Sequence, residues 1–144
     1  RHGRRDAPAR HARTAERRMN VLVDTSVWVD HFRRGNAALV ALLQADLALT
    51  HPMVLLELAC GTPPQPRQRT LGDIAQLQSS QQASQREVLE LIEREKLYGQ
   101  GCGLVDMVLL ASTLITPAAQ LWTLDQRLAA LAARFGVAHT PVIH

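Results

Sequence analysis

The sequence predicts an α/β fold: a doubly wound, mostly parallel central sheet flanked by helices. Short apolar runs alternate along the chain with longer stretches in which apolar residues recur at helical spacing. The apolar runs are continuous rather than alternating, as in strands that are buried on both faces. Helices between parallel strands give right-handed crossover units. At 144 residues, the chain is long enough for one domain with a substantial core.

The first strand is expected over residues 21–23, which are apolar and mostly β-branched. A helix should follow to residue 34, because Thr25 or Ser26 can cap its start and a glycine stands directly after its end. Asn36 can cap a second helix, in which leucine and valine recur at helical spacing.

The later elements follow from the same signals. Residues 47–50 form a short apolar run typical of a buried strand, and Pro52 suits the first turn of a helix that ends near Gly61. The remaining expectations are helices over 67–77, 87–97, 104–114 and 126–135, a strand over 120–123, and terminal strand candidates at 136–138 and 141–143.

Charge divides the chain into two parts. Residues 1–18 contain seven arginines and two acids, a net charge of +5, whereas residues 19–144 carry −2. We interpret residues 1–18 as an upstream or expression-derived basic extension, without the apolar segment of a secretory signal, and residues 19–144 as the folded domain. The competing interpretation is a native basic arm that binds nucleic acid.

Cysteine usage and hydropathy favour a cytoplasmic protein that does not enter a membrane. Cys60 and Cys102 lack metal-binding spacing, and we expect both to be small buried residues in a reducing compartment. The segment 102–122 is mostly apolar, but Asp106 within it would be costly at the centre of a bilayer. A buried helix followed by a buried strand explains this segment better.

Four acids stand in largely apolar surroundings: Asp24 at a strand end, Glu57 and Asp106 in apolar helices, and Asp125 after a strand. Each has a structural alternative. Asp24 could cap a turn, Glu57 could face solvent, and Asp106 and Asp125 could stabilise helix N-termini. A parallel sheet would nevertheless bring all four toward one edge, where ligands of such folds bind.

Clustered carboxylates raise one another's pKa unless a cation lies between them. Oxygen ligands without histidine or cysteine suit Mg²⁺ or Mn²⁺, and such ions engage phosphate oxygens. The hydroxyls of Thr25, Ser26 and Thr123 could orient a water molecule or a phosphate. The residues therefore predict phosphoryl-transfer chemistry by a metal-activated water, without selecting a substrate.

The segments around these acids resemble the four acidic blocks of PIN-domain ribonucleases, and most closely those of VapC toxins from bacterial toxin–antitoxin systems. The resemblance covers residues 19–144 in the family's order, and the four blocks together are specific although each alone is weak. They are VLVDTSVW at 21–28, LLEL at 55–58, GLVDMVLLA at 103–111 and LWTLDQRL at 121–128.

The resemblance implies a Mg²⁺- or Mn²⁺-dependent endoribonuclease that cuts structured RNA, such as tRNA or ribosomal RNA. Asp24 and Asp106 would bind the metal most directly, and Glu57 and Asp125 would complete the site. A homodimer held inactive by a VapB-type antitoxin is also implied. The candidates for RNA binding are Arg33, Arg34, Arg67 and Arg69, because arginine suits phosphate recognition.

Three other functions share features with this sequence. A receiver domain needs a lysine at the end of a late strand, but the only lysine, Lys96, falls in an expected helix. A hydrolase of the HAD type would have a second acid two residues after Asp24, where Ser26 stands. The third is a non-catalytic module that binds an antitoxin and acts in repression of its own operon; this role is compatible with a nuclease.

Overall fold

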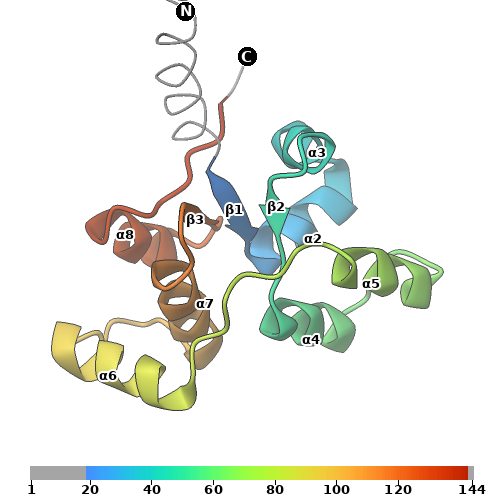
Figure 1. The fold of residues 1–144 in the computed structure, drawn as a ribbon. Coiled ribbons are helices and arrows are strands. Elements are labelled where there is room, and N and C mark those ends of the chain that lie inside the picture. The colour runs from blue at the N-terminus through green and yellow to red at the C-terminus, as the bar shows by residue number, and fades with distance from the viewer. Residues whose placement is uncertain (1–18, 143–144) are drawn as a thin grey trace, which may run out of the picture.

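A sheet of three parallel strands forms the centre of the computed structural model, which describes residues 19–142 (Figure 1). Strand β1 (Asn20–Val23) lies between β2 (Ala48–Leu49) and β3 (Ala119–Trp122). The side chains of residues 21–23 are at most 1% exposed, although successive side chains point to opposite faces. Both faces of the sheet are therefore covered, and the predicted doubly wound α/β fold is confirmed.

Helices surround the sheet in two groups. Figure 1 shows α7 and α8 beside β3 and α6 on the outer side of α7, whereas α2 to α5 gather on the β2 side. The group beside β3 includes α7, six of whose eleven residues are buried, in agreement with its predicted central position. The helices of the described part are α2 (Thr25–Arg34), α3 (Ala37–Gln44), α4 (Pro52–Cys60), α5 (Arg67–Ala75), α6 (Gln85–Glu95), α7 (Leu104–Leu114) and α8 (Gln126–Arg134).

The connections place helix starts at one edge of the sheet. Helices α2, α4 and α8 begin shortly after the C-terminal ends of β1, β2 and β3, respectively. Helix N-termini carry unpaired N–H groups and a partial positive charge, which favour acidic side chains. This edge therefore combines strand ends and helix starts, as the sequence predicted.

The structure corrects several predicted details. Strand β2 has two residues rather than four, and Thr50 forms only an isolated bridge, with Ser79. The terminal strand at 136–138 is reduced to a bridge between Ala138 and Leu121. Residues 141–142 form no strand, and the end of that prediction, like the predicted extension at 1–18, lies outside the described residues.

The prediction that both cysteines are buried is wrong. Cys60 is exposed because it is the last residue of α4, and Cys102 is only partly buried because it lies in the loop before α7. Over residues 19–142, no helix is both long and apolar enough to cross a membrane.

Candidate active site

Asp24 is the buried centre of the site, at the C-terminal end of β1 and 5% exposed. Its Oδ2 accepts hydrogen bonds from Ser26 Oγ at 2.7 Å and Thr123 Oγ1 at 2.8 Å. Although Asp24 occupies the N-cap position of α2, its side chain caps no backbone N–H there. The alternative that Asp24 serves only as a cap is therefore wrong.

The two hydroxyls also fix the loop after β3. Ser26 Oγ accepts a hydrogen bond from Leu124 N at 2.9 Å, and Thr123 Oγ1 accepts one from Asp125 N at 3.0 Å. Each hydroxyl thus donates to the Asp24 carboxylate and accepts from the backbone of the neighbouring loop. Ser26 and Thr123, predicted to orient water or phosphate, here orient Asp24.

Asp125 and Asp106 both lie at helix starts. Asp125 Oδ1 caps α8 by accepting hydrogen bonds from Arg127 N at 2.9 Å and Leu128 N at 3.0 Å. Asp106, in the first turn of α7, accepts a hydrogen bond from Gly103 N at 3.1 Å. Both acids therefore stabilise helix N-termini, as the structural alternatives predicted. In each carboxylate these hydrogen bonds use one oxygen, and the other oxygen remains available to a ligand.

The electrostatics show that three of the acids share one edge. Partial burial raises the pKa of Asp106, and the charges of Asp24 and Asp125 raise it further. Within the described residues, the one effect that lowers this pKa is the hydrogen bond from Gly103. The carboxyl groups therefore repel one another, which is the condition that a divalent cation would relieve.

Glu57 approaches the site from α4 and is exposed. It is joined to the start of α2 by a hydrogen bond of 2.7 Å, which Thr25 Oγ1 donates to Glu57 Oε1. Thr25, predicted to orient water or phosphate, thus holds Glu57. This acid is connected to the Asp24 side of the site through the backbone of α2.

The four acids do not form a closed metal cage. In the described part of the chain, no three acidic, histidine or cysteine side chains lie close enough together to hold one ion. The chemistry of the oxygen donors and the repulsion at Asp106 fit a hard divalent cation. Binding one would require the carboxylates to turn toward a common point.

Comparison with known proteins shows the family to which the chain belongs. The PIN-domain family matches residues 21–134. The chain belongs to the PIN-domain family. It is also 46% identical over 118 residues to ribonuclease VapC32 of Mycobacterium tuberculosis, in strains CDC 1551 / Oshkosh and ATCC 25618 / H37Rv. The alignment covers 82% of this chain and 94% of each relative, so this PIN domain is of the VapC type.

The structure separates the four arginine candidates of this PIN domain. Arg33 lines a cavity of about 360 Å³ together with Thr25 and Glu57, beside the site. Arg34 instead forms an ion pair with Asp30, with Nε 2.6 Å from Oδ1.

The other two arginines lie at or near the N-terminal end of α5. Arg67 donates hydrogen bonds to the carbonyl groups of Ala59, at 2.8 Å, and Gly61, at 3.3 Å, and so covers the C-terminal end of α4. Arg69 is exposed. Of the four candidates, Arg33 is the one that lines the cavity beside Glu57.

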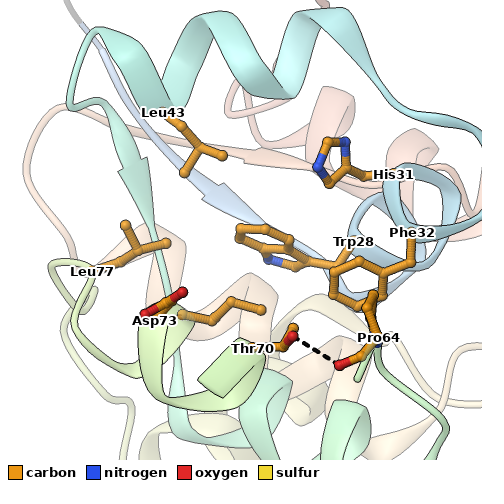
Figure 2. A pocket seen from close by; sticks show the side chains of 9 residues that line it. Trp28, His31, Phe32, Leu43, Pro64, Thr70, Asp73 and Leu77 are labelled. Atoms are coloured by element: carbon orange, nitrogen blue, oxygen red, sulfur yellow. Dashed lines mark hydrogen bonds between the residues drawn. The ribbon is translucent and has the colours of Figure 1, made fainter. Parts of the chain in front are cut away.

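A second cavity, of about 450 Å³, was not foreseen from the sequence (Figure 2). Trp28 and Phe32 of α2 lie against each other on one side of it, and Asp73 and Leu77 lie on another. The indole N–H of Trp28 is buried without a hydrogen-bond partner among the described residues. The available signal was the placement of two of the chain's five aromatic residues four positions apart on one helix.

Proposed function

We propose that this PIN domain is the toxin of a type II toxin–antitoxin system and an endoribonuclease that depends on Mg²⁺ or Mn²⁺. The observation that carries the proposal is the partly buried Asp106 carboxyl, which lies in the field of the buried Asp24 carboxylate and of Asp125. The relative named ribonuclease VapC32, aligned over nearly its whole length, supports the same activity.

The residues have distinct roles in the proposed reaction. Asp24 and Asp106 would hold the metal most directly, and Asp125 and Glu57 would complete the site. The chemistry that such an ion supplies when bound is activation of the attacking water and neutralisation of phosphate charge. Ser26 and Thr123 restrict the rotation of Asp24 through their two hydrogen bonds to Oδ2, which leaves Oδ1 for a ligand.

The proposed substrate is structured RNA, either tRNA or ribosomal RNA, cut by hydrolysis of a phosphodiester bond in the cytoplasm. Arg33 is the best placed of the predicted RNA-binding residues, because it lines the cavity beside Glu57. Arg34 and Arg67 are less suitable, since both are engaged in contacts within the protein.

The proposed partner is a VapB-type antitoxin. The cavity beside Trp28 suits an extended peptide segment of this partner, because it combines apolar and polar lining residues and Trp28 has a donor without an acceptor. A main-chain carbonyl group of the partner would satisfy that donor once the indole turned toward the cavity, because the nitrogen itself is buried. Trp28→Phe keeps an aromatic side chain, although a smaller one, and removes the donor, so it should weaken antitoxin binding in calorimetric titration, whereas Val40→Ala, on the exposed surface of α3, should not.

The proposed assembly is a homodimer. Leu89 of α6 and Leu104 of α7 are 59% and 69% exposed, and both line an apolar cavity of about 440 Å³ beside the start of α4. Exposed leucines around one cavity mark a surface that a second copy would cover. Leu89→Glu should convert a dimer to a monomer in sedimentation velocity.

The activity is tested by incubating the protein with total bacterial RNA in Mg²⁺, in Mn²⁺ and in EDTA. We expect discrete fragments with metal and none with EDTA, and a loss of at least about 100-fold in rate for Asp24→Asn and for Asp106→Asn. Asp46→Asn is the matched control, because Asp46 is an exposed acid outside the site. Its backbone has a left-handed conformation, which asparagine tolerates.

The alternative is a non-catalytic module that binds the antitoxin and acts in operon autoregulation. The Trp28 cavity favours a binding role without excluding catalysis. Intact RNA in both metals, together with antitoxin binding that Asp24→Asn leaves unchanged, would replace the nuclease proposal with this one.

A further inference from the structure

Arg127 connects the starts of the two helices that carry Asp125 and Asp106. It lies in the first turn of α8, and its backbone N–H donates to Asp125 Oδ1. Its guanidinium group extends to the loop before α7, where Nη1 donates to the Gly101 carbonyl oxygen at 3.3 Å. The side chain therefore lies along the edge that the two acids share.

Gly101 is adapted to this contact in two ways. Its φ of +84° lies in the region that residues with a Cβ rarely adopt. A Cβ at this position would also overlap Arg127 Nη1 and lie 2.9 Å from Cζ. The guanidinium group thus rests directly on the loop backbone, in a place that only glycine leaves open.

The charge of Arg127 is not neutralised by an acid. The ion pairs within residues 19–142 join Arg34 to Asp30, and Arg94 and Arg134 to Glu95. Arg127 is exposed. Among residues 19–142, its guanidinium group makes one hydrogen bond, to the carbonyl oxygen of Gly101. About four of its five N–H donors are therefore available to a ligand.

The charge of Arg127 influences the thiol of Cys102, in the loop before α7. Burial raises the pKa of Cys102, and the charges of Asp106 and Asp125 add to the rise, whereas the charge of Arg127 opposes it. The guanidinium group therefore acts on the same loop as the charges of Asp106 and Asp125, at Cys102. A cation there offsets the repulsion between the acidic edge and a polyanion.

We propose that Arg127 is a phosphate-binding residue of this site, whose guanidinium group holds an RNA phosphate next to the one that is cleaved. The inference rests on the proposed nuclease function. A planar guanidinium group binds phosphate through two parallel hydrogen bonds. Because Gly101 already supports the side chain, less conformational freedom is lost when RNA binds.

The salt dependence of RNA binding tests the proposal. The probe is 5′-fluorescein-labelled oligouridylate with Mg²⁺, and anisotropy is measured in an Asp24→Asn background so that the RNA stays intact. Arg127→Gln should weaken binding several-fold and reduce the slope of log K against log salt by about 0.7, the value for one phosphate contact on a single strand. Arg127→Lys should retain the slope with weaker binding, because it keeps the charge and loses the fork.

Two further variants make the result specific. Arg94→Gln removes an exposed charge from α6, where Arg94 lines a cavity with Leu114 at the opposite end of α7 from Asp106, and should leave the slope unchanged. Gly101→Ala retains the charge of Arg127 but displaces its guanidinium group, so it should weaken binding while retaining the slope, as Arg127→Lys does. Equal slopes and affinities for Arg127→Gln and Arg94→Gln would overturn the proposal.

Cleavage of total RNA by the protein with native Asp24 distinguishes failure of the Arg127 proposal from failure of the proposed nuclease function. With Mg²⁺, Arg127→Gln should raise KM more than it lowers kcat, since the residue binds a phosphate that does not react. A loss confined to kcat would overturn the proposed role. If the wild-type protein cleaves RNA while Arg127→Gln behaves like Arg94→Gln, the inference fails alone. If the wild-type protein neither cleaves nor binds RNA, the proposed function fails with it.

Discussion

Thr123 Oγ1 donates a hydrogen bond of 2.8 Å to Asp24 Oδ2 and so joins the C-terminal ends of two neighbouring parallel strands. The backbone supports the same junction, because Asp24 N donates to the Trp122 carbonyl oxygen at 2.9 Å. Thr123 also accepts a hydrogen bond from Asp125 N. One hydroxyl therefore fixes the central carboxylate of the site and the loop that carries a second one.

Replacing Thr123 by valine should destabilise the fold. The buried Asp24 carboxylate would lose one of its two hydroxyl donors and Asp125 N would lose its acceptor, so we expect a cost of about 1–3 kcal/mol in the free energy of unfolding. Urea denaturation measures this cost. Thr123→Ser retains the hydroxyl and should recover most of the stability. Equal stability of the valine and wild-type proteins would show that the hydroxyl contributes nothing.

The repulsion among the acids is directly measurable. The pKa of Asp106 is raised by burial and then by the charges of Asp24 and Asp125, so Asp125→Asn should lower it toward the ordinary aspartate value. Carboxyl ¹³C NMR of the metal-free protein follows this titration. Asp46→Asn is the control and should leave the pKa of Asp106 unchanged. The same result for both variants would place Asp106 outside the field of Asp125.

The sequence predicted the sheet and the positions of the acids because both depend on local signals. The run at residues 21–23 has to be buried on both faces, and an acid that ends such a run has to lie at the sheet edge. The roles of the hydroxyls depended on contacts across nearly a hundred residues, such as the one from Thr123 to Asp24. No local pattern indicates such a contact.

The arginines show the same limit. Composition suggested phosphate binding for Arg34 and Arg67, but Asp30 lies one helical turn before Arg34, and the loop between α4 and α5 returns Arg67 to the end of α4. The sequence does not indicate Arg127, although it follows Asp125 by two residues, because its contact with Gly101 depends on how two loops meet. Side-chain partners in the tertiary structure, rather than residue type, decide which charges remain available.

Arg67 and Arg69 should therefore differ in their effect on stability. Arg67→Ala removes donors from the carbonyl groups of Ala59 and Gly61, so it should lower the free energy of unfolding by about 1 kcal/mol. Arg69→Ala alters an exposed side chain and should change it by less than about 0.5 kcal/mol. Urea denaturation compares the two variants. If both were neutral for stability and Arg67→Ala weakened RNA binding, the original prediction for Arg67 would be restored.

His51 should make the fold sensitive to mild acid. Its Nδ1 accepts a hydrogen bond from Met53 N at 3.0 Å and caps α4, so the proton lies on Nε2, which contacts Ser112 Oγ at 3.1 Å. Burial lowers the pKa of this imidazole below its ordinary value. Protonation would remove the acceptor that caps α4 and place a charge in the core.

The sign of the pH effect follows from the two states. Just below about pH 6.5 the unfolded chain binds a proton at His51 and the folded protein does not, so stability is highest above that pH and falls as pH decreases toward the folded pKa. Urea denaturation at about pH 7.5 and about pH 5.5 should show the decrease. His51→Asn keeps a capping side chain that does not titrate and should reduce the decrease. Part of the decrease in stability should remain in this variant, because burial also lowers the pKa of His139. Identical pH dependence in the two proteins would assign the acid sensitivity to other groups.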